Sequence, residues 1–152
     1  MPTTLTTLAR VAALAAALAG SAAAQQPAAA GRAFRVIVNA ENPVSTLDEA
    51  EVSRLFLRKT ATWQSGEPVL PIEQAKGSPV RVAFEREIHK KSDSELERYW
   101  QVMVFTGKGS PPPTRTSDAD VIELVRHSLY AIAYVSAAAT LPPDIKSVTI
   151  AH

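Results

Sequence analysis

Short apolar runs alternate along the chain with segments whose apolar residues recur every three or four positions. The short runs are rich in β-branched residues, as strands are, and cover residues 34–38, 69–72, 131–135 and 147–150. The segments with helical spacing begin near residues 46, 78, 92 and 117. Strands separated by helices predict an α/β domain with a mostly parallel sheet. Pro71 cannot donate to a strand ladder, so the strand that contains it is predicted to be short or at an edge.

The starts of the predicted helices are alike, with one exception. Three of them have a small polar cap followed by an acid, as in a capping box, namely Thr46–Glu49, Ser92–Glu95 and Ser117–Asp120. Such an acid accepts from free backbone donors and balances the positive end of the helix dipole. The remaining helix begins at Ser78 and Pro79 and carries Arg81 where the others carry an acid. It ends in the basic cluster 89–91, which we expect to be solvated.

The helix start with a cation in its first turn is the best candidate for a binding site. A small polar cap, a flexible glycine and a guanidinium together suit an external anion. The predicted ligand-binding residues are Gly77, Ser78 and Arg81, with Ser45 and Thr46 at another helix start as lesser candidates. Alternatively, Arg81 points into water or pairs with Glu85 four residues later, which is worth only about 0.3–0.5 kcal/mol.

The N-terminal residues have the pattern of an export signal. Arg10 precedes the apolar run 11–19, which is too short to span a bilayer, and the small residues Ala22–Ala24 follow. We therefore predict a signal peptide over residues 1–24, a loose leader over 25–32, and one domain over 33–152. No cysteine follows the apolar run, which excludes a lipid anchor, whereas a retained membrane anchor is the alternative. The predicted location is the bacterial periplasm.

Composition and the lack of known motifs exclude several classes of function. Removing 24 of the 152 residues leaves 128, enough for one domain with a core. Without Arg10, 15 basic residues balance 15 acidic ones, so nothing favours a nucleic-acid partner. The chain has no cysteine, and its three histidines lack metal-ligand spacing. No hydrolase, zinc-protease or dinucleotide motif is present, so we predict neither an enzyme nor a cofactor.

Three stretches, taken in order, carry a family resemblance. They are Leu55–Lys59 with Trp63–Val69, then Lys76–Phe84, then Ala131–Val135. Their order and spacing are similar to those of the periplasmic phosphate-type substrate-binding proteins of ABC transporters, and the likeness covers most of Phe34 to Ile150. The resemblance implies a single three-layer α/β lobe, periplasmic-binding-protein-like, with an anion site at the Gly77–Ser78 helix start.

Two functions follow from this resemblance. In the first, the lobe binds phosphate or another oxyanion and works with a membrane transporter partner in the periplasm. In the second, it is an interaction or structural protein that has lost the ligand. The second is favoured by Glu73, where the phosphate binders of the family have an arginine, and by Pro79, which replaces a hydroxyl and an amide donor. The oligomeric state is left open.

Overall fold

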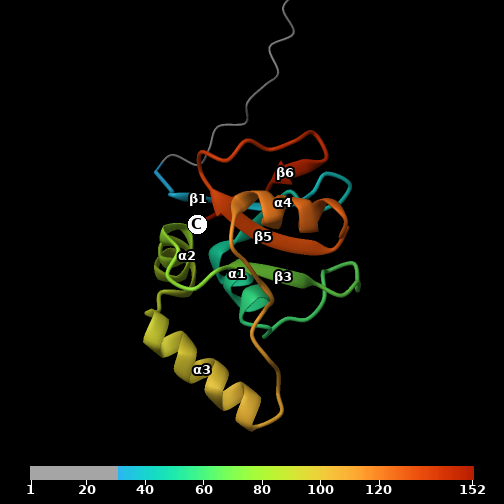
Figure 1. Ribbon diagram of the computed structural model, residues 1–152. Helices are drawn as coiled ribbons and strands as arrows, with labels where there is room; N and C mark the ends of the chain where they lie inside the picture. The colour runs from blue at the N-terminus through green and yellow to red at the C-terminus, as the bar shows by residue number, and fades with distance from the viewer. Residues whose placement is uncertain (1–30) are drawn as a thin grey trace, which may run out of the picture.

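The structure is a computed structural model that describes residues 31–152 (Figure 1). The predicted signal peptide and nearly all of the predicted leader lie outside the described residues. Within residues 31–152, no helix is both long and apolar enough to cross a bilayer.

A five-stranded sheet with the order β4-β3-β5-β1-β6 forms the centre of the domain. Its strands are β1 (Phe34–Asn39), β3 (Leu70–Gln74), β4 (Thr114–Arg115), β5 (Ala131–Ser136) and β6 (Ile145–Ser147). β3 pairs in parallel with β4 and β5, whereas β1 is antiparallel to both β5 and β6. Four of the five strands therefore run in one direction, which confirms the prediction of a mostly parallel sheet.

Helices cover both faces of this sheet (Figure 1). Ile132 and Tyr134 of β5 point to the face covered by α1 (Glu49–Phe56) and α2 (Pro79–Phe84). The alternate residues of β5 point to the opposite face, where they pack on α4 (Asp118–Arg126). This arrangement confirms the predicted three-layer lobe. It also explains why β5 is apolar from Ala131 to Val135, since a strand buried on both faces has no polar side.

The first predicted helix start is wrong. Thr46 lies in a short strand, β2 (Thr46–Asp48), which pairs in parallel with β7 (Thr149–Ala151). The N-cap of α1 is Asp48 instead, whose Oδ1 accepts from the Glu51 amide at 2.6 Å. The predicted strand over 147–150 divides at Val148, which leaves β6 in the large sheet and β7 in the small one.

Aromatic side chains fill the core beneath α2. The Phe84 ring stacks on Tyr134 with centroids 3.9 Å apart and an 11° interplanar angle. Residues Glu85–His89 continue α2 as a π-helix, η1. The His89 ring packs on the Phe84 ring in a T-shaped arrangement, with the ring centroids 5.3 Å apart. The prediction of a solvated basic cluster is therefore wrong for His89, which is buried, although Lys90 beside it is exposed.

Helix α3 (Asp93–Phe105) stands apart from the sheet, at the lower end of the molecule in Figure 1. Ser92 and Glu95 form the predicted capping box. Leu96 and Trp100 pack on Leu57, which follows α1, in a small cluster separate from the two main cores. α3 is therefore held by few buried residues, and part of its surface is left uncovered.

Candidate functional site

The turn from β3 into α2 has the local structure that the sequence predicts. Gly77 is exposed with a φ of +80°, a conformation that favours glycine. The Ser78 Oγ accepts from the Arg81 amide at 3.3 Å, and Pro79 occupies the first helical position. Among the α-helices that the structure describes, only α2 has no acid in its first turn. The positive end of this helix is therefore not balanced by an acid of its own.

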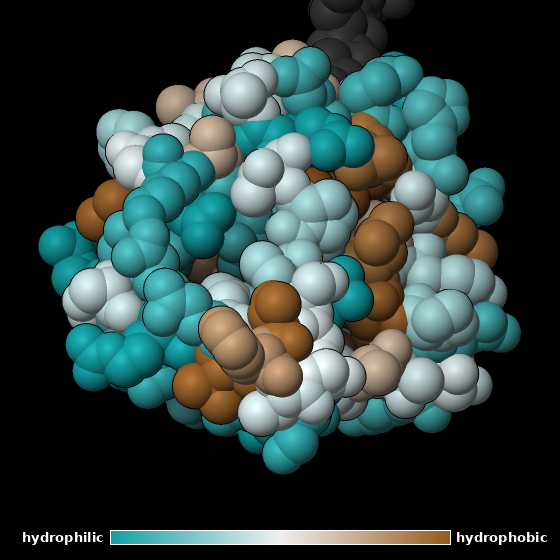
Figure 2. Space-filling model, turned by 60° about the horizontal axis from the view of Figure 1, so that its bottom comes forward, coloured by the Kyte–Doolittle hydropathy of each residue, from teal (hydrophilic) through white to brown (hydrophobic). Residues whose placement is uncertain are grey.

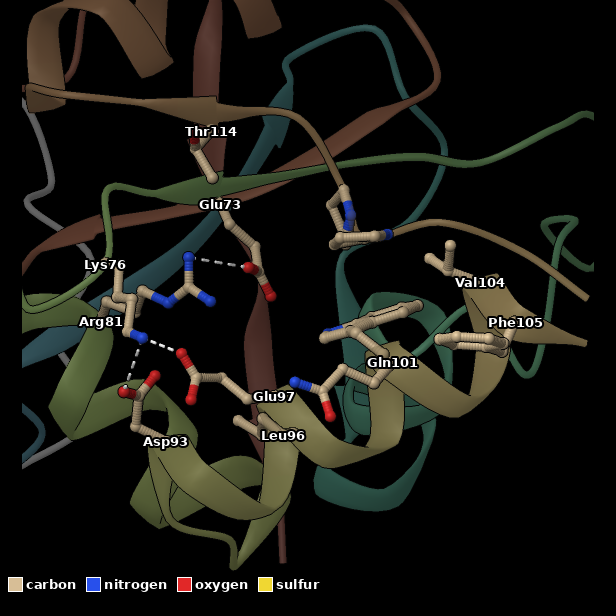
Figure 3. A pocket seen from close by; sticks show the side chains of 13 residues that line it. Glu73, Lys76, Arg81, Asp93, Leu96, Glu97, Gln101, Val104, Phe105 and Thr114 are labelled. Atoms are coloured by element: carbon tan, nitrogen blue, oxygen red, sulfur yellow. Dashed lines mark hydrogen bonds and ion pairs between the residues drawn. The ribbon is translucent and has the colours of Figure 1, made fainter. Parts of the chain in front are cut away.

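The Arg81 side chain turns inward, away from the start of its helix (Figure 3). Its Nε donates to Glu85 Oε1 at 2.6 Å, and its Nη1 donates to the Gln74 carbonyl at 2.9 Å. Nη1 also lies 3.1 Å from Glu73 Oε2. The structure therefore confirms the alternative in which Arg81 pairs with Glu85. It also shows a buried network where that alternative assumed an exposed pair.

Glu73 is the unusual member of this network. Its burial raises the pKa of its carboxyl group to about 7; Arg81 opposes this rise and the nearby Glu85 carboxylate adds to it. The distance from Oε2 to Arg81 Nη1 is short, yet Oε2 accepts no aligned hydrogen bond within the described residues. Arg81 Nη1 donates to the Gln74 carbonyl instead. Glu73 is therefore a buried acid with incomplete compensation.

Lys76 connects the turn to α3. Its ammonium group lies 3.4 Å from Asp93 Oδ2 and also contacts Glu97 (Figure 3). All three side chains are about half exposed, so these pairs are worth little individually. They nevertheless set one cation between two carboxylates, just as Arg81 lies between Glu73 and Glu85.

A groove of about 560 Å³ lies between α3 and the β3–β4 side of the sheet, and we call it the α3 groove. Glu73, Lys76 and Arg81 line its polar end (Figure 3). Its apolar walls consist of Leu96, Trp100, Val104, Phe105, Pro111 and Pro112. Figure 2 turns this end of the molecule forward and shows hydrophobic groups at the surface beside a hollow.

Ser45 and Thr46 lie elsewhere. β1 runs antiparallel to β5, whereas β3 runs parallel to it. The carboxyl ends of β1 and β3 therefore lie at opposite ends of the strands, and the loop after β1 is on the other side of the domain from the turn after β3. Asn42 fixes that loop by donating to the carbonyl of Leu129, just before β5. Within residues 31–152, no hydrogen bond or ion pair joins Ser45 or Thr46 to the Gly77–Arg81 segment. The structure therefore keeps Gly77 and Ser78 together at one turn, directs the Arg81 side chain away from that turn into its buried network, and leaves the two lesser candidates apart.

The α3 groove is the feature that sequence reasoning missed. A signal for it was present, because Val102, Val104 and Phe105 crowd the end of one helix and cannot all face the domain. In the structure all three are exposed, and Phe105 keeps 93% of its surface. Over residues 31–152, no group of three His, Cys, Asp or Glu side chains is placed to hold a metal ion.

Neither a family model nor a curated protein sequence matches this chain. Solved structures do match, at low sequence identity. A protein described as a phosphate ABC transporter substrate-binding protein, from Clostridium perfringens and with bound phosphate, superposes with a TM-score of 0.63 at 18% identity. An ABC-type phosphate transport receptor from Vibrio cholerae gives 0.62 at 15%, and PstS from Borrelia burgdorferi gives 0.61 at 12%.

The match covers 78% of this chain in all three cases, but only 44%, 46% and 47% of the respective solved chains. The described domain therefore has the fold of an ABC-transporter substrate-binding protein. In particular, it has the fold of the phosphate type, which confirms the fold that the sequence resemblance implied. The matched region covers less than half the length of these proteins.

Proposed function

We propose that this chain is an exported binding lobe that offers the Gly77–Ser78 turn to an oxyanion, with phosphate as the first candidate. It acts in the periplasm beside a membrane transporter and catalyses no reaction. Its fold is that of proteins described as phosphate-binding components of ABC transporters, one of them solved with phosphate. Because those proteins are more than twice as long as the matched region, their function supports this proposal by analogy alone.

The observation that carries the proposal is the start of α2. The turn is exposed at Gly77, capped by Ser78, and free of acids within its first helical turn. Backbone donors at such a start attract an anion through hydrogen bonds and the helix dipole. Arg81 has a different part in this proposal: it ties the end of β3 to α2 through the Gln74 carbonyl and holds the turn in place.

Thermal unfolding with and without phosphate tests the proposal. Phosphate at about 100 times its dissociation constant should stabilise the wild type by ~2.7 kcal/mol, which is visible in the unfolding midpoint. Ser78→Asp should abolish this rise, because aspartate still caps the helix but places a carboxylate where the oxyanion would bind. Ser65→Asp, at another exposed turn, adds the same charge and should leave the rise intact. A midpoint that phosphate does not move would contradict the proposal.

The second candidate is a lobe that binds a partner protein and no oxyanion. Two observations favour it: Glu73 and Glu85 already neutralise Arg81, and the end of α3 exposes Val104 and Phe105. The same unfolding experiment separates the two candidates. If neither phosphate nor sulfate shifts the midpoint of a well-folded wild type, the second candidate becomes the better account.

A further inference from the structure

The charges around the α3 groove do not balance. The carboxylates that line it belong to Glu73, Asp93 and Glu97, and they lie against two cations, Lys76 and Arg81. One negative charge is therefore left over when every group is ionised, and Arg81 is also shared with Glu85, which does not line the groove. A net-negative cluster favours a cationic ligand and disfavours an anionic one.

Glu73 lies at the floor of the groove. It is 3% exposed, and its Oε2 lies 3.1 Å from Arg81 Nη1 but accepts no aligned hydrogen bond within the described residues. Figure 3 shows its carboxylate directed into the space that faces α3. Burying an ion without a full set of partners costs free energy, and a donor supplied from outside would recover part of that cost.

The rest of the groove suits an apolar body. Trp100, Val104 and Phe105 of α3 form one wall, and Pro111 and Pro112 form another. The volume of about 560 Å³ falls within the range of roughly 300–1,000 Å³ that is usual for small-ligand sites. A ligand that matches both ends carries a compact cation on an apolar group.

We propose that the α3 groove binds a small organic amine, with its ammonium group against Glu73 and its apolar part against Trp100, Val104 and Phe105. A free small molecule fits better than a protein segment, because the carboxylate lies on the floor of the groove and only a thin group can reach it. This site does not depend on the oxyanion site, which uses the start of α2. Either site can therefore fail without the other.

A titration with 2-phenylethylamine, monitored by two-dimensional NMR of the full mature chain, tests the proposal. We expect saturable shifts of the Trp100 indole and of the Val104 and Phe105 amides. Glu73→Gln should weaken the binding at least tenfold, because it keeps the size of the side chain and removes the charge. Glu41→Gln, at an exposed acid in the loop after β1, should leave it unchanged. The spectrum of each variant without ligand shows whether it is folded.

Two probes of the same shape separate charge from apolarity. 2-Phenylethanol and 3-phenylpropionate should bind at least tenfold more weakly than the amine. Equal binding of the alcohol would overturn the proposal, since the groove would then recognise the ring alone. The proposal would also be wrong if the amine caused no shift while a Lys-Phe peptide did, because the occupant would then be a protein segment. Phosphate is titrated separately and is monitored at the Gly77 and Ser78 amides. A failure of the proposed oxyanion site can therefore be distinguished from a failure of the amine site.

Discussion

Glu73 and Glu85 compete for one guanidinium, and the outcome depends on pH. Because the folded state raises the pKa of Glu73 to about 7, the folded protein keeps a proton that the unfolded chain releases near its ordinary value of 4.5. Stability contributed by this group is therefore lost as pH rises through that window, and the loss is complete above pH 7. The buried network is thus most favourable in mildly acidic solution.

Glu73→Gln should make this dependence visible. Glutamine is neutral at every pH, so the variant should be more stable than the wild type at pH 8.5, by on the order of 3 kcal/mol. Near pH 4.5 the two proteins should be about equally stable. Urea unfolding at both pH values measures the difference. A difference in unfolding free energy that stays constant between pH 4.5 and 8.5 would show that Glu73 does not titrate in this window.

His89 works in the opposite direction and explains why the variant is needed. Burial lowers the pKa of His89 to about 4, and Arg81, Lys91 and Lys59 add to the effect. Between about pH 4 and 6.5, the unfolded chain therefore binds a proton at His89 that the folded protein does not bind. The free energy of unfolding decreases as pH falls from about 6.5 towards 4. The two groups offset each other between these limits. Comparing Glu73→Gln with the wild type at each pH removes the His89 contribution, since both proteins contain it.

At the residue scale, a contact was predictable when the two residues that form it are near each other in the sequence. The Ser78 cap, the Arg81–Glu85 spacing and the role of Gly77 all follow from residues within a few positions of each other. The contact between Arg81 and Glu73 crosses from a helix back to a strand and depends on how the turn folds. Sequence reasoning identified Glu73 as a residue that would repel an anion, but it did not place it beside Arg81.

At the scale of elements, α3 differs from the rest of the domain. Its buried residues are Leu96 and Trp100, whereas every residue of β5 from Ala131 to Val135 is buried. It is also attached by exposed ion pairs, by the Lys59 ammonium group over the Tyr99 ring, and by a hydrogen bond from the Tyr99 hydroxyl to the Leu57 carbonyl at 2.7 Å. A helix with so few buried apolar contacts opens more easily than the core.

Hydrogen exchange should therefore separate α3 from the sheet. The α3 amides should exchange by local opening, with a free energy well below that of the β5 amides, which should follow global unfolding. Native-state exchange measured at increasing denaturant concentration gives both values for one protein in one experiment. Equal protection of the Trp100 amide and the Tyr134 amide would show that α3 is part of the cooperative core.

Elements were predictable from sequence when their signals were local and strong. Ser92 and Ser117 begin helices as expected. Pro71 also lies where its missing donor is tolerated, because β4 pairs with β3 only at Glu73 and Gln74. The helix start at Thr46 failed because a pairing with Thr149, about a hundred residues away, overrides the local capping pattern.

At the scale of the whole molecule, apolar residues on both faces of the central strands determined the three layers. β5 is apolar on both faces, and β1 adds Phe34, Val36 and Val38 to one core and Ile37 to the other, which requires cover on both sides and places α1 and α2 opposite α4. Strand order and the antiparallel direction of β1 depend on long-range pairing, and neither could be predicted from periodicity. The α3 groove likewise depends on where the loop after α3 returns to the sheet, so it emerged only from the structure.

The central claim is that the start of α2 binds an oxyanion. The most direct measurement is a phosphate titration of the protein followed through its backbone amides by NMR. The account predicts saturable shifts centred on Gly77, Ser78 and Val80, with none at Ser45 and Thr46. Shifts spread evenly over basic surface residues, or no saturation at millimolar phosphate, would contradict it and would leave the lobe without an oxyanion site at this turn.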